Sequence, residues 1–207
     1  MRDEAIKKIC KTLTEKYGVL LNEKVALDFF AREGDWQTQY YAQRVKKIHA
    51  WEIDKKFKDK LKQNLPSNAE ITIGDSFLLA KSKSGLFDMV VIDNPQGCYG
   101  HKGNYCEHFE ALPAALELLK GNTGILIFNV KTVPFNYEDK FQWQKRRNDF
   151  YSLEDCSSLS KDFMLQFYKK YLDKKGYHTN FAFLVNRPQE TGLESLTLQI
   201  TQKNDDN

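Results

Sequence analysis

Residues 25–54, VALDFFAREGDWQTQYYAQRVKKIHAWEID, constrain the fold of this chain more than any other stretch. Their pattern predicts, in order, a strand over 25–30, a helix over 36–45 and a strand over 48–52. An acidic residue ends each strand, Asp28 in the first and Glu52 in the second, and Gly34 lies in the connecting loop. Two buried strands joined through a helix indicate a βαβ unit, and the acidic ends suggest the nucleotide half of a cofactor site.

The alternation of strand and helix continues through most of the chain. Further strands are predicted over 70–73, 87–93, 123–130, 177–185 and 193–201, and further helices over 3–17, 55–65, 77–81, 107–120 and 162–175. This spacing predicts right-handed crossovers and a parallel sheet. The last two strands are joined by a short turn, which forces them antiparallel. Residues 134–160 interrupt the rhythm and are expected to be irregular.

Composition is that of an ordinary soluble domain. The 207 residues are 41% hydrophobic and 29% charged, with a net charge of +3. We find no run of about 18 apolar residues, so we expect no membrane span. Four cysteines in a chain this long do not suggest a secreted disulfide framework, and we expect a cytoplasmic protein. The mild basic balance is compatible with a nucleic-acid partner without requiring one. No linker is evident, so 1–207 is expected to be one domain, with 1–24 as a leading helix segment.

The order of elements and several short motifs resemble the class I S-adenosylmethionine-dependent methyltransferases over nearly the whole chain. The motifs are Asp28 to Gly34 after the first strand, Glu52-Ile53 after the second and Gly74-Asp75-Ser76 after the third. A dinucleotide-binding dehydrogenase would instead show Gly-x-Gly-x-x-Gly, which this chain lacks. The resemblance implies an α/β, Rossmann-like three-layer sandwich. Its seven-stranded sheet would be mostly parallel and would end in a C-terminal antiparallel hairpin.

The resemblance also implies S-adenosyl-L-methionine as the cofactor. Glu52 would accept both ribose hydroxyls, Ile53 would face the adenine, and Asp75 would accept from the adenine amino group. The residues implied to bind the cofactor are Asp28, Phe30, Ala31, Gly34, Glu52, Ile53, Asp75 and Ser76. Arg32 stands where the family has its first glycine. It could narrow the pocket, supply a new contact to the cofactor carboxylate, or mark a site that no longer binds cofactor.

Each acidic residue also has a simpler interpretation. An acidic side chain just after a strand is usually a helix cap or a solvated loop residue. The combination of Asp28, Glu52 and Asp75, each following one of three consecutive predicted strands, is much harder to obtain by chance. Parallel strands bring their carboxyl ends to one edge of the sheet, where ligands bind in such folds.

Asp93-Asn94-Pro95 follows the strand FDMVVID and resembles part of the acceptor motif of amino-group methyltransferases. In that motif a polar side chain and a proline-fixed carbonyl accept hydrogen bonds from the target amine, so catalysis is mainly positioning. Asp93, Asn94 and Pro95 are therefore candidate catalytic residues. The family's second proline and aromatic residue are missing unless Tyr99 substitutes. The alternative is an Asn-Pro turn that simply leaves the strand.

Cys98, His101, Cys106 and His108 are all residue types that bind zinc, but their spacing is not that of a finger or ribbon. We expect a lid over the site rather than a metal centre, and assign no metal ligand.

Residues 131–160 are expected to form an insertion on the substrate side, in which cations are mixed with aromatic residues. This composition is typical of single-stranded nucleic-acid contacts, and equally of a loop packed on its own domain. The candidate substrate-binding residues are Tyr99, Trp143, Arg146 and Arg147. The function predicted is methylation of a nitrogen of a nucleic-acid base or similar amine. The alternative is a catalytically degenerate methyltransferase fold that acts as an RNA- or protein-binding module.

Overall fold

A computed structural model describes residues 4–93, 98–99, 105–106, 108–132, 141–188 and 192–203. For 98–99, 105–106 and 141–143 it describes the backbone alone. Asn94, Pro95 and His101 therefore lie outside the described residues, as do the side chains of Tyr99 and Trp143.

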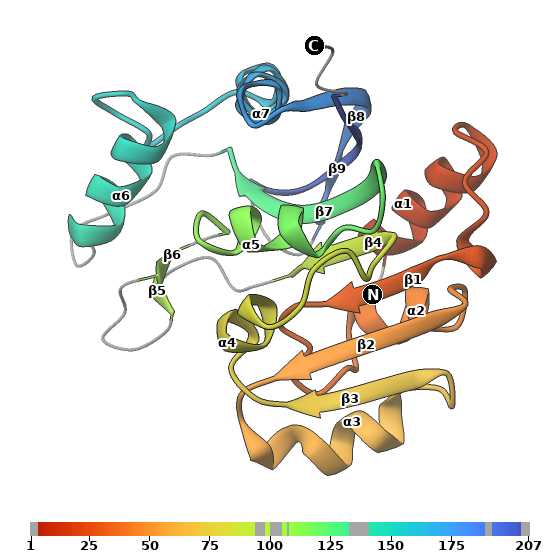
Figure 1. Ribbon diagram of the computed structural model, residues 1–207. Helices are drawn as coiled ribbons and strands as arrows, with labels where there is room; N and C mark the ends of the chain where they lie inside the picture. The colour runs from red at the N-terminus through yellow and green to blue at the C-terminus, as the bar shows by residue number, and fades with distance from the viewer. Residues whose placement is uncertain are drawn as a thin grey trace.

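A seven-stranded sheet with the order β3-β2-β1-β4-β7-β9-β8 forms the centre of the molecule (Figure 1). Its strands are β1 Val25–Asp28, β2 Lys47–Glu52, β3 Ala69–Ile73, β4 Met89–Ile92, β7 Thr123–Lys131, β8 Tyr177–Asn186 and β9 Leu193–Gln202. The first five are parallel, whereas β9 is antiparallel to both β7 and β8. The predicted α/β sandwich, with a mostly parallel sheet and an antiparallel terminal hairpin, is confirmed.

Helices cover both faces of the sheet. They are α1 Glu4–Glu15, α2 Gln37–Ala42, α3 Lys58–Asn64, α4 Ser76–Lys81, α5 Ala111–Leu118, α6 Phe141–Tyr151 and α7 Lys161–Lys174, with short 3-10 turns η1 Leu21–Glu23 and η2 Lys55–Phe57. One apolar cluster joins the sheet to α1, α2 and α3, and a second joins it to α4, α5 and α7. In α1 the buried Ile6, Ile9 and Leu13 recur at helical spacing, which is why this segment packs on the sheet as a helix.

Local chemistry sets where the strands and helices begin and end. The first strand ends at Asp28 because the Asp28 Oδ1 atom accepts a hydrogen bond from the Phe30 backbone N–H at 3.2 Å and closes a turn. The predicted helix over 107–120 begins only at Ala111. Pro113 explains the delay, since proline is tolerated in the first turn of a helix but would clash with the carbonyl four residues earlier if the helix began sooner.

The prediction of an irregular segment over 134–160 was wrong for Phe141–Tyr151, which forms α6. Phe150 stacks on Phe109 with ring centroids 4.0 Å apart, and Tyr151 packs edge-on against Phe167 at 4.9 Å. These aromatic contacts stabilise a helix whose own sequence has little amphipathic pattern. Within the expected lid, β5 Cys98–Tyr99 and β6 Tyr105–Cys106 pair as a short antiparallel ladder.

Candidate functional site

Four acidic residues lie at or just beyond the carboxyl-terminal ends of the parallel strands. Asp28 ends β1, Glu52 ends β2, Asp75 follows β3 and Asp93 follows β4. These strands are parallel neighbours, so their carboxyl ends meet at the same edge of the sheet. The chain runs outward from β1 to β2 and β3 and then returns to β4 on the other side of β1. This edge therefore contains a topological switch point, the usual ligand site of an open α/β sheet.

Asp28 anchors the helix that follows it. Its Oδ2 atom accepts hydrogen bonds from Thr38 Oγ1 at 2.5 Å and from the Tyr41 hydroxyl at 3.0 Å, both on α2. The side chain is almost fully buried, and burial raises the pKa of Asp28 to about 6. In this structure Asp28 joins β1 to α2, and its role toward a cofactor stays a prediction.

Glu52 is buried and connects two loops at the edge. Its Oε2 atom accepts from the backbone N–H of Arg32 at 2.7 Å, and its Oε1 atom accepts from the backbone N–H of Asp54 at 2.8 Å. A carboxylate oxygen has two lone-pair positions, so each oxygen can accept one further hydrogen bond. Glu52 is thus fixed by the protein and still able to bind a ligand that presents a pair of hydroxyl groups.

The loop from Ala31 to Gly34 has a constrained backbone. Its first N–H, that of Ala31, donates to the carbonyl of Trp51 at 2.9 Å, and the Gly34 N–H donates back to the Ala31 carbonyl at 2.9 Å. Gly34 has φ +71°, and a Cβ there would lie 3.1 Å from the side chains of Leu61 and Leu65. Glycine suits position 34, because this conformation disfavours a side chain and a Cβ would crowd Leu61 and Leu65.

Arg32 adopts a left-handed conformation with φ 48°, although it has a side chain. This is the position at which the resemblance places a glycine, and the structure supplies the glycine-like backbone there. The exposed guanidinium lies 5.6 Å from the ring centroid of Trp36 and 5.9 Å from that of Phe57.

Asp75 is the N-cap of α4, which is the simpler of the two interpretations of this residue. Its Oδ1 atom accepts from the backbone N–H groups of Phe77 at 2.8 Å and Leu78 at 3.4 Å. Ser76 is buried, and its hydroxyl donates to the Phe29 carbonyl at 2.6 Å. Asp75 and Ser76 thus fix α4 to the loop after β1, and their contacts with a cofactor stay predictions.

Apolar side chains surround this loop. Phe30 packs against Phe29 and Phe77, with ring centroids 4.9 and 6.1 Å away, and Ala31 is buried. Ile53 is 65% exposed, and Leu78 is 63% exposed. Large aliphatic side chains with this exposure beside Glu52 and Asp75 suit the face of a flat apolar ring.

Asp93 belongs to a network of polar residues that the sequence did not indicate. Its Oδ1 atom accepts from Arg187 Nη1 at 2.5 Å and from Asn129 Nδ2 at 2.6 Å, and its Oδ2 atom accepts from Gln37 Nε2 at 2.8 Å. Arg187 Nη1 also donates to Asn129 Oδ1 at 2.9 Å. The expected role of Asp93, accepting a hydrogen bond from a target amine, would have to use lone pairs that these donors leave available.

Asn129 could have been found from the sequence. It is a lone amide in β7, within the otherwise apolar run from Ile125 to Val130. A buried amide needs a partner, which marks such a residue as part of a network. Arg187, 94 residues from Asp93, offers no comparable local signal.

Two of the four expected substrate-binding residues, Arg146 and Arg147, make contacts within the protein, and their role toward a substrate stays a prediction. Arg146 pairs with Glu110. Arg147 is fully buried, donates from Nη2 to the carbonyl of Lys131 at 3.1 Å and lies 5.5 Å from the Tyr151 ring. Arg147 as placed supports α6 from within, because a buried guanidinium cannot reach a phosphate in solvent. Tyr99 and Trp143 have no described side chains.

His108 is buried and hydrogen-bonded through Nε2 to the Tyr168 hydroxyl. Burial lowers the pKa of His108 to about 3, so the imidazole is neutral. No group of metal-binding side chains occurs within the residues that the structure describes. Of the other residues considered as zinc ligands, Cys98 and Cys106 are opposite one another in the β5–β6 ladder, their side chains being outside the description.

None of the described helices is long and apolar enough to cross a membrane.

Comparison by sequence finds no match among protein-family models or curated proteins. Comparison by structure does. M. jannaschii TYW2 in complex with AdoMet is 16% identical, with a TM-score of 0.57 over 98% of this chain and 78% of that one.

Two further solved structures are similar over nearly all of this chain. Burkholderia thailandensis 1,6-didemethyltoxoflavin-N1-methyltransferase, with S-adenosylhomocysteine bound, is 15% identical, with a TM-score of 0.56 over 98% of this chain and 80% of that one. M. jannaschii tRNA m1G37 methyltransferase is 14% identical, with a TM-score of 0.52 over 99% of this chain and 49% of that one. At such identities the likeness establishes the fold, which is that of the class I S-adenosylmethionine-dependent methyltransferases.

Proposed function

We propose that this protein is an S-adenosylmethionine-dependent methyltransferase. The observation that supports it best is the position of Glu52, a buried carboxylate at the end of β2 that is held by two backbone N–H groups. Each Glu52 oxygen can still accept one hydroxyl, which suits the two ribose hydroxyls of the cofactor. The AdoMet and S-adenosylhomocysteine complexes of two structures with the same fold support the same choice of ligand.

The residues around Glu52 fit the remaining parts of that cofactor. Ile53 and Leu78 would lie against the adenine ring, and the tight loop from Ala31 to Gly34 would approach the methionine part. When bound, the cofactor supplies an electrophilic methyl group on its sulfonium. The protein would orient the cofactor through the loop after β1. Asp28 accepts a hydrogen bond from Thr38 of α2, and Ser76 of α4 donates one to the Phe29 carbonyl, so the loop is fixed to both helices.

The proposed acceptor is a nitrogen of a nucleic-acid base or a similar amine. Asp93 lies at the switch point with its carboxylate orientation fixed by Gln37, Asn129 and Arg187, and Asn94-Pro95 follow it in the sequence. A fixed acceptor of hydrogen bonds can orient an amine so that its lone pair faces the methyl carbon, which is catalysis by positioning. One of the structures with this fold is a tRNA methyltransferase, which supports testing RNA first.

Calorimetry with S-adenosylhomocysteine tests the cofactor assignment. We expect binding to the wild type and a loss of about 10- to 100-fold in affinity for Glu52→Gln. The Gln amide keeps one acceptor oxygen, and its NH2 group can accept neither a ribose hydroxyl nor the backbone N–H that the second carboxylate oxygen holds. Glu70→Gln is the matched control, since Glu70 is an exposed acidic residue on β3 and pairs with Lys47. Absence of binding to the wild type would contradict the proposal and would favour a binding module that no longer uses cofactor.

Transfer of a tritiated methyl group to pools of RNA, DNA and protein then tests the acceptor class. We expect incorporation into RNA, and its loss in Asp93→Asn with cofactor affinity unchanged. Incorporation into protein alone would overturn the nucleic-acid part of the proposal while leaving the methyltransferase assignment intact.

A further inference from the structure

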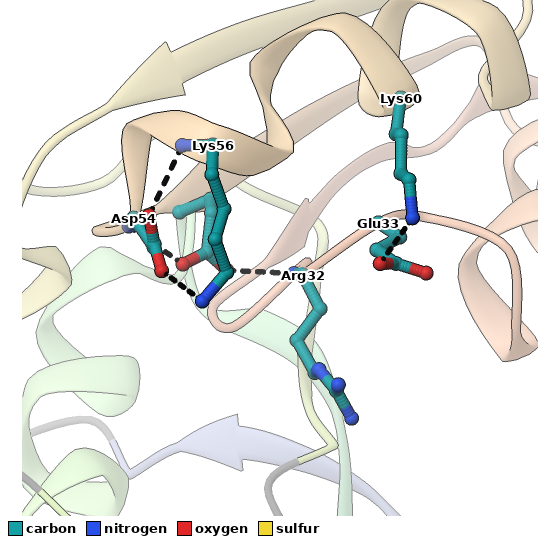
Figure 2. Close-up of polar contacts among 6 residues, drawn as sticks. Arg32, Glu33, Asp54, Lys56 and Lys60 are labelled. Atoms are coloured by element: carbon teal, nitrogen blue, oxygen red, sulfur yellow. Dashed lines mark hydrogen bonds and ion pairs between the residues drawn. The ribbon is translucent and has the colours of Figure 1, made fainter.

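Arg32 is a cation at the candidate cofactor site that forms no ion pair with the described residues. Two acidic residues of these loops are already paired with lysines: Glu33 with Lys60 at 2.7 Å and Asp54 with Lys56 at 2.5 Å. Figure 2 shows the Arg32 side chain extending away from both ion pairs. Within the part of the chain that the structure describes, no carboxylate lies at ion-pair distance from the Arg32 guanidinium.

The position of Arg32 is costly to the chain. A left-handed conformation disfavours any residue with a Cβ by roughly 1–2 kcal/mol, and Arg32 has φ 48° where glycine would adopt it freely. The guanidinium also lies near the rings of Trp36 and Phe57, which limit its motion while leaving it exposed. Backbone strain at an exposed residue of a candidate site is an outlier from which a ligand contact can be inferred.

The backbone of Arg32 is tied to the residue that would hold the ribose. Its N–H donates to Glu52 Oε2 at 2.7 Å, so the Arg32 side chain starts beside the proposed ribose position. The methionine part of the cofactor extends from the ribose and ends in a carboxylate. An arginine side chain is about as long as that methionine part, and its guanidinium matches a carboxylate with two parallel hydrogen bonds.

We propose that Arg32 binds the carboxylate of the cofactor's methionine part and so replaces a glycine turn with a charged contact. This inference rests on the proposed function, because it names a contact within the same site. With this contact, loss of the ligand carboxylate lowers the affinity more than it would in a protein that has glycine at this position.

Two ligands that differ in the methionine part test this contact. S-adenosylhomocysteine has the carboxylate, whereas 5′-methylthioadenosine keeps the adenine and ribose but lacks it. By calorimetry we expect Arg32→Gln to weaken S-adenosylhomocysteine by about 10- to 100-fold and to change 5′-methylthioadenosine by less than about twofold. Arg32→Gly, which relieves the backbone strain, is expected to show the same selective loss. Lys60→Gln is the matched control, since it removes a nearby cation that is already paired.

The outcomes separate this inference from the proposed function. If neither nucleoside binds the wild type, the proposed function fails. If both bind and Glu52→Gln weakens both, but Arg32→Gln weakens neither or both equally, only the role of Arg32 is overturned. Unchanged S-adenosylhomocysteine affinity in Arg32→Gln, together with weaker retention of RNA, would assign the guanidinium to a nucleic-acid phosphate instead and would also overturn it.

Discussion

Asp28 lies at the end of β1 with its carboxylate buried against two hydroxyl groups of α2. Burial raises its pKa from 3.8 to about 6. Between about pH 4 and pH 6 the folded state therefore binds a proton that the unfolded state has released. Stability falls as pH rises through this window, and the total is about 3 kcal/mol for a shift of about two pKa units.

Asp28→Asn removes that proton equilibrium. We expect the difference in free energy of unfolding, variant minus wild type, to increase by about 3 kcal/mol from pH 4 to pH 7. Urea unfolding at each pH measures it. Asp59→Asn, at an exposed position of α3, is the control and should show no comparable trend. A constant difference between Asp28→Asn and the wild type across this range would contradict the assignment.

At the scale of elements, the sequence predicted the strands well because their signals are local. Runs such as MVVI in β4, buried at every position, are recognisable without knowing their neighbours. The acidic residues at strand ends were found for the same reason. What their side chains contact could not be deduced, because Asp75 caps α4 and Asp28 anchors α2 through geometry that appears only after folding.

The elements that sequence analysis missed depend on distant contacts. Helix α6 is stabilised by rings from other elements, Phe109 and Phe167 among them. Arg187 reaches Asp93 from the end of β8, across the intervening strands β7 and β9. Such partners are set by strand order, and a single sequence states strand order only indirectly.

The Arg187–Asp93 pair attaches the terminal hairpin to the strand that leads into the acceptor motif. Its side chains are only 7% and 16% exposed, so Arg187→Met leaves a largely buried carboxylate with fewer donors. We expect a loss of about 3–5 kcal/mol in the free energy of unfolding, measured by urea denaturation.

A surface pair near the same hairpin provides the control. Lys203 and Asp173 are 45% and 63% exposed, and Lys203→Met should cost less than about 1 kcal/mol. In a double-mutant cycle, Asp93→Asn should recover part of the Arg187→Met loss. Equal losses for Arg187→Met and Lys203→Met would show that the buried pair contributes no special stability.

At the scale of the whole molecule, the candidate ligand-binding loops lie at one end of the parallel strands and the connecting turns lie at the other. The carboxyl-terminal edge holds the loops after β1, β2 and β3 with their hydrogen bonds to Glu52 and Asp75, whereas the opposite edge holds turns such as η1 and Gly85. A ligand bound at the switch point would contact only the first set.

Deuterium uptake measured at short labelling times, with and without S-adenosylhomocysteine, should therefore decrease over residues 29–36, 52–57 and 74–78 and stay unchanged over 19–24 and 82–86. Glu52→Gln, at a ligand concentration close to the wild-type Kd, should show a much smaller decrease. A uniform decrease over both edges would indicate general stabilisation rather than a site at the switch point, and a decrease confined to 19–24 would place the ligand at the opposite edge.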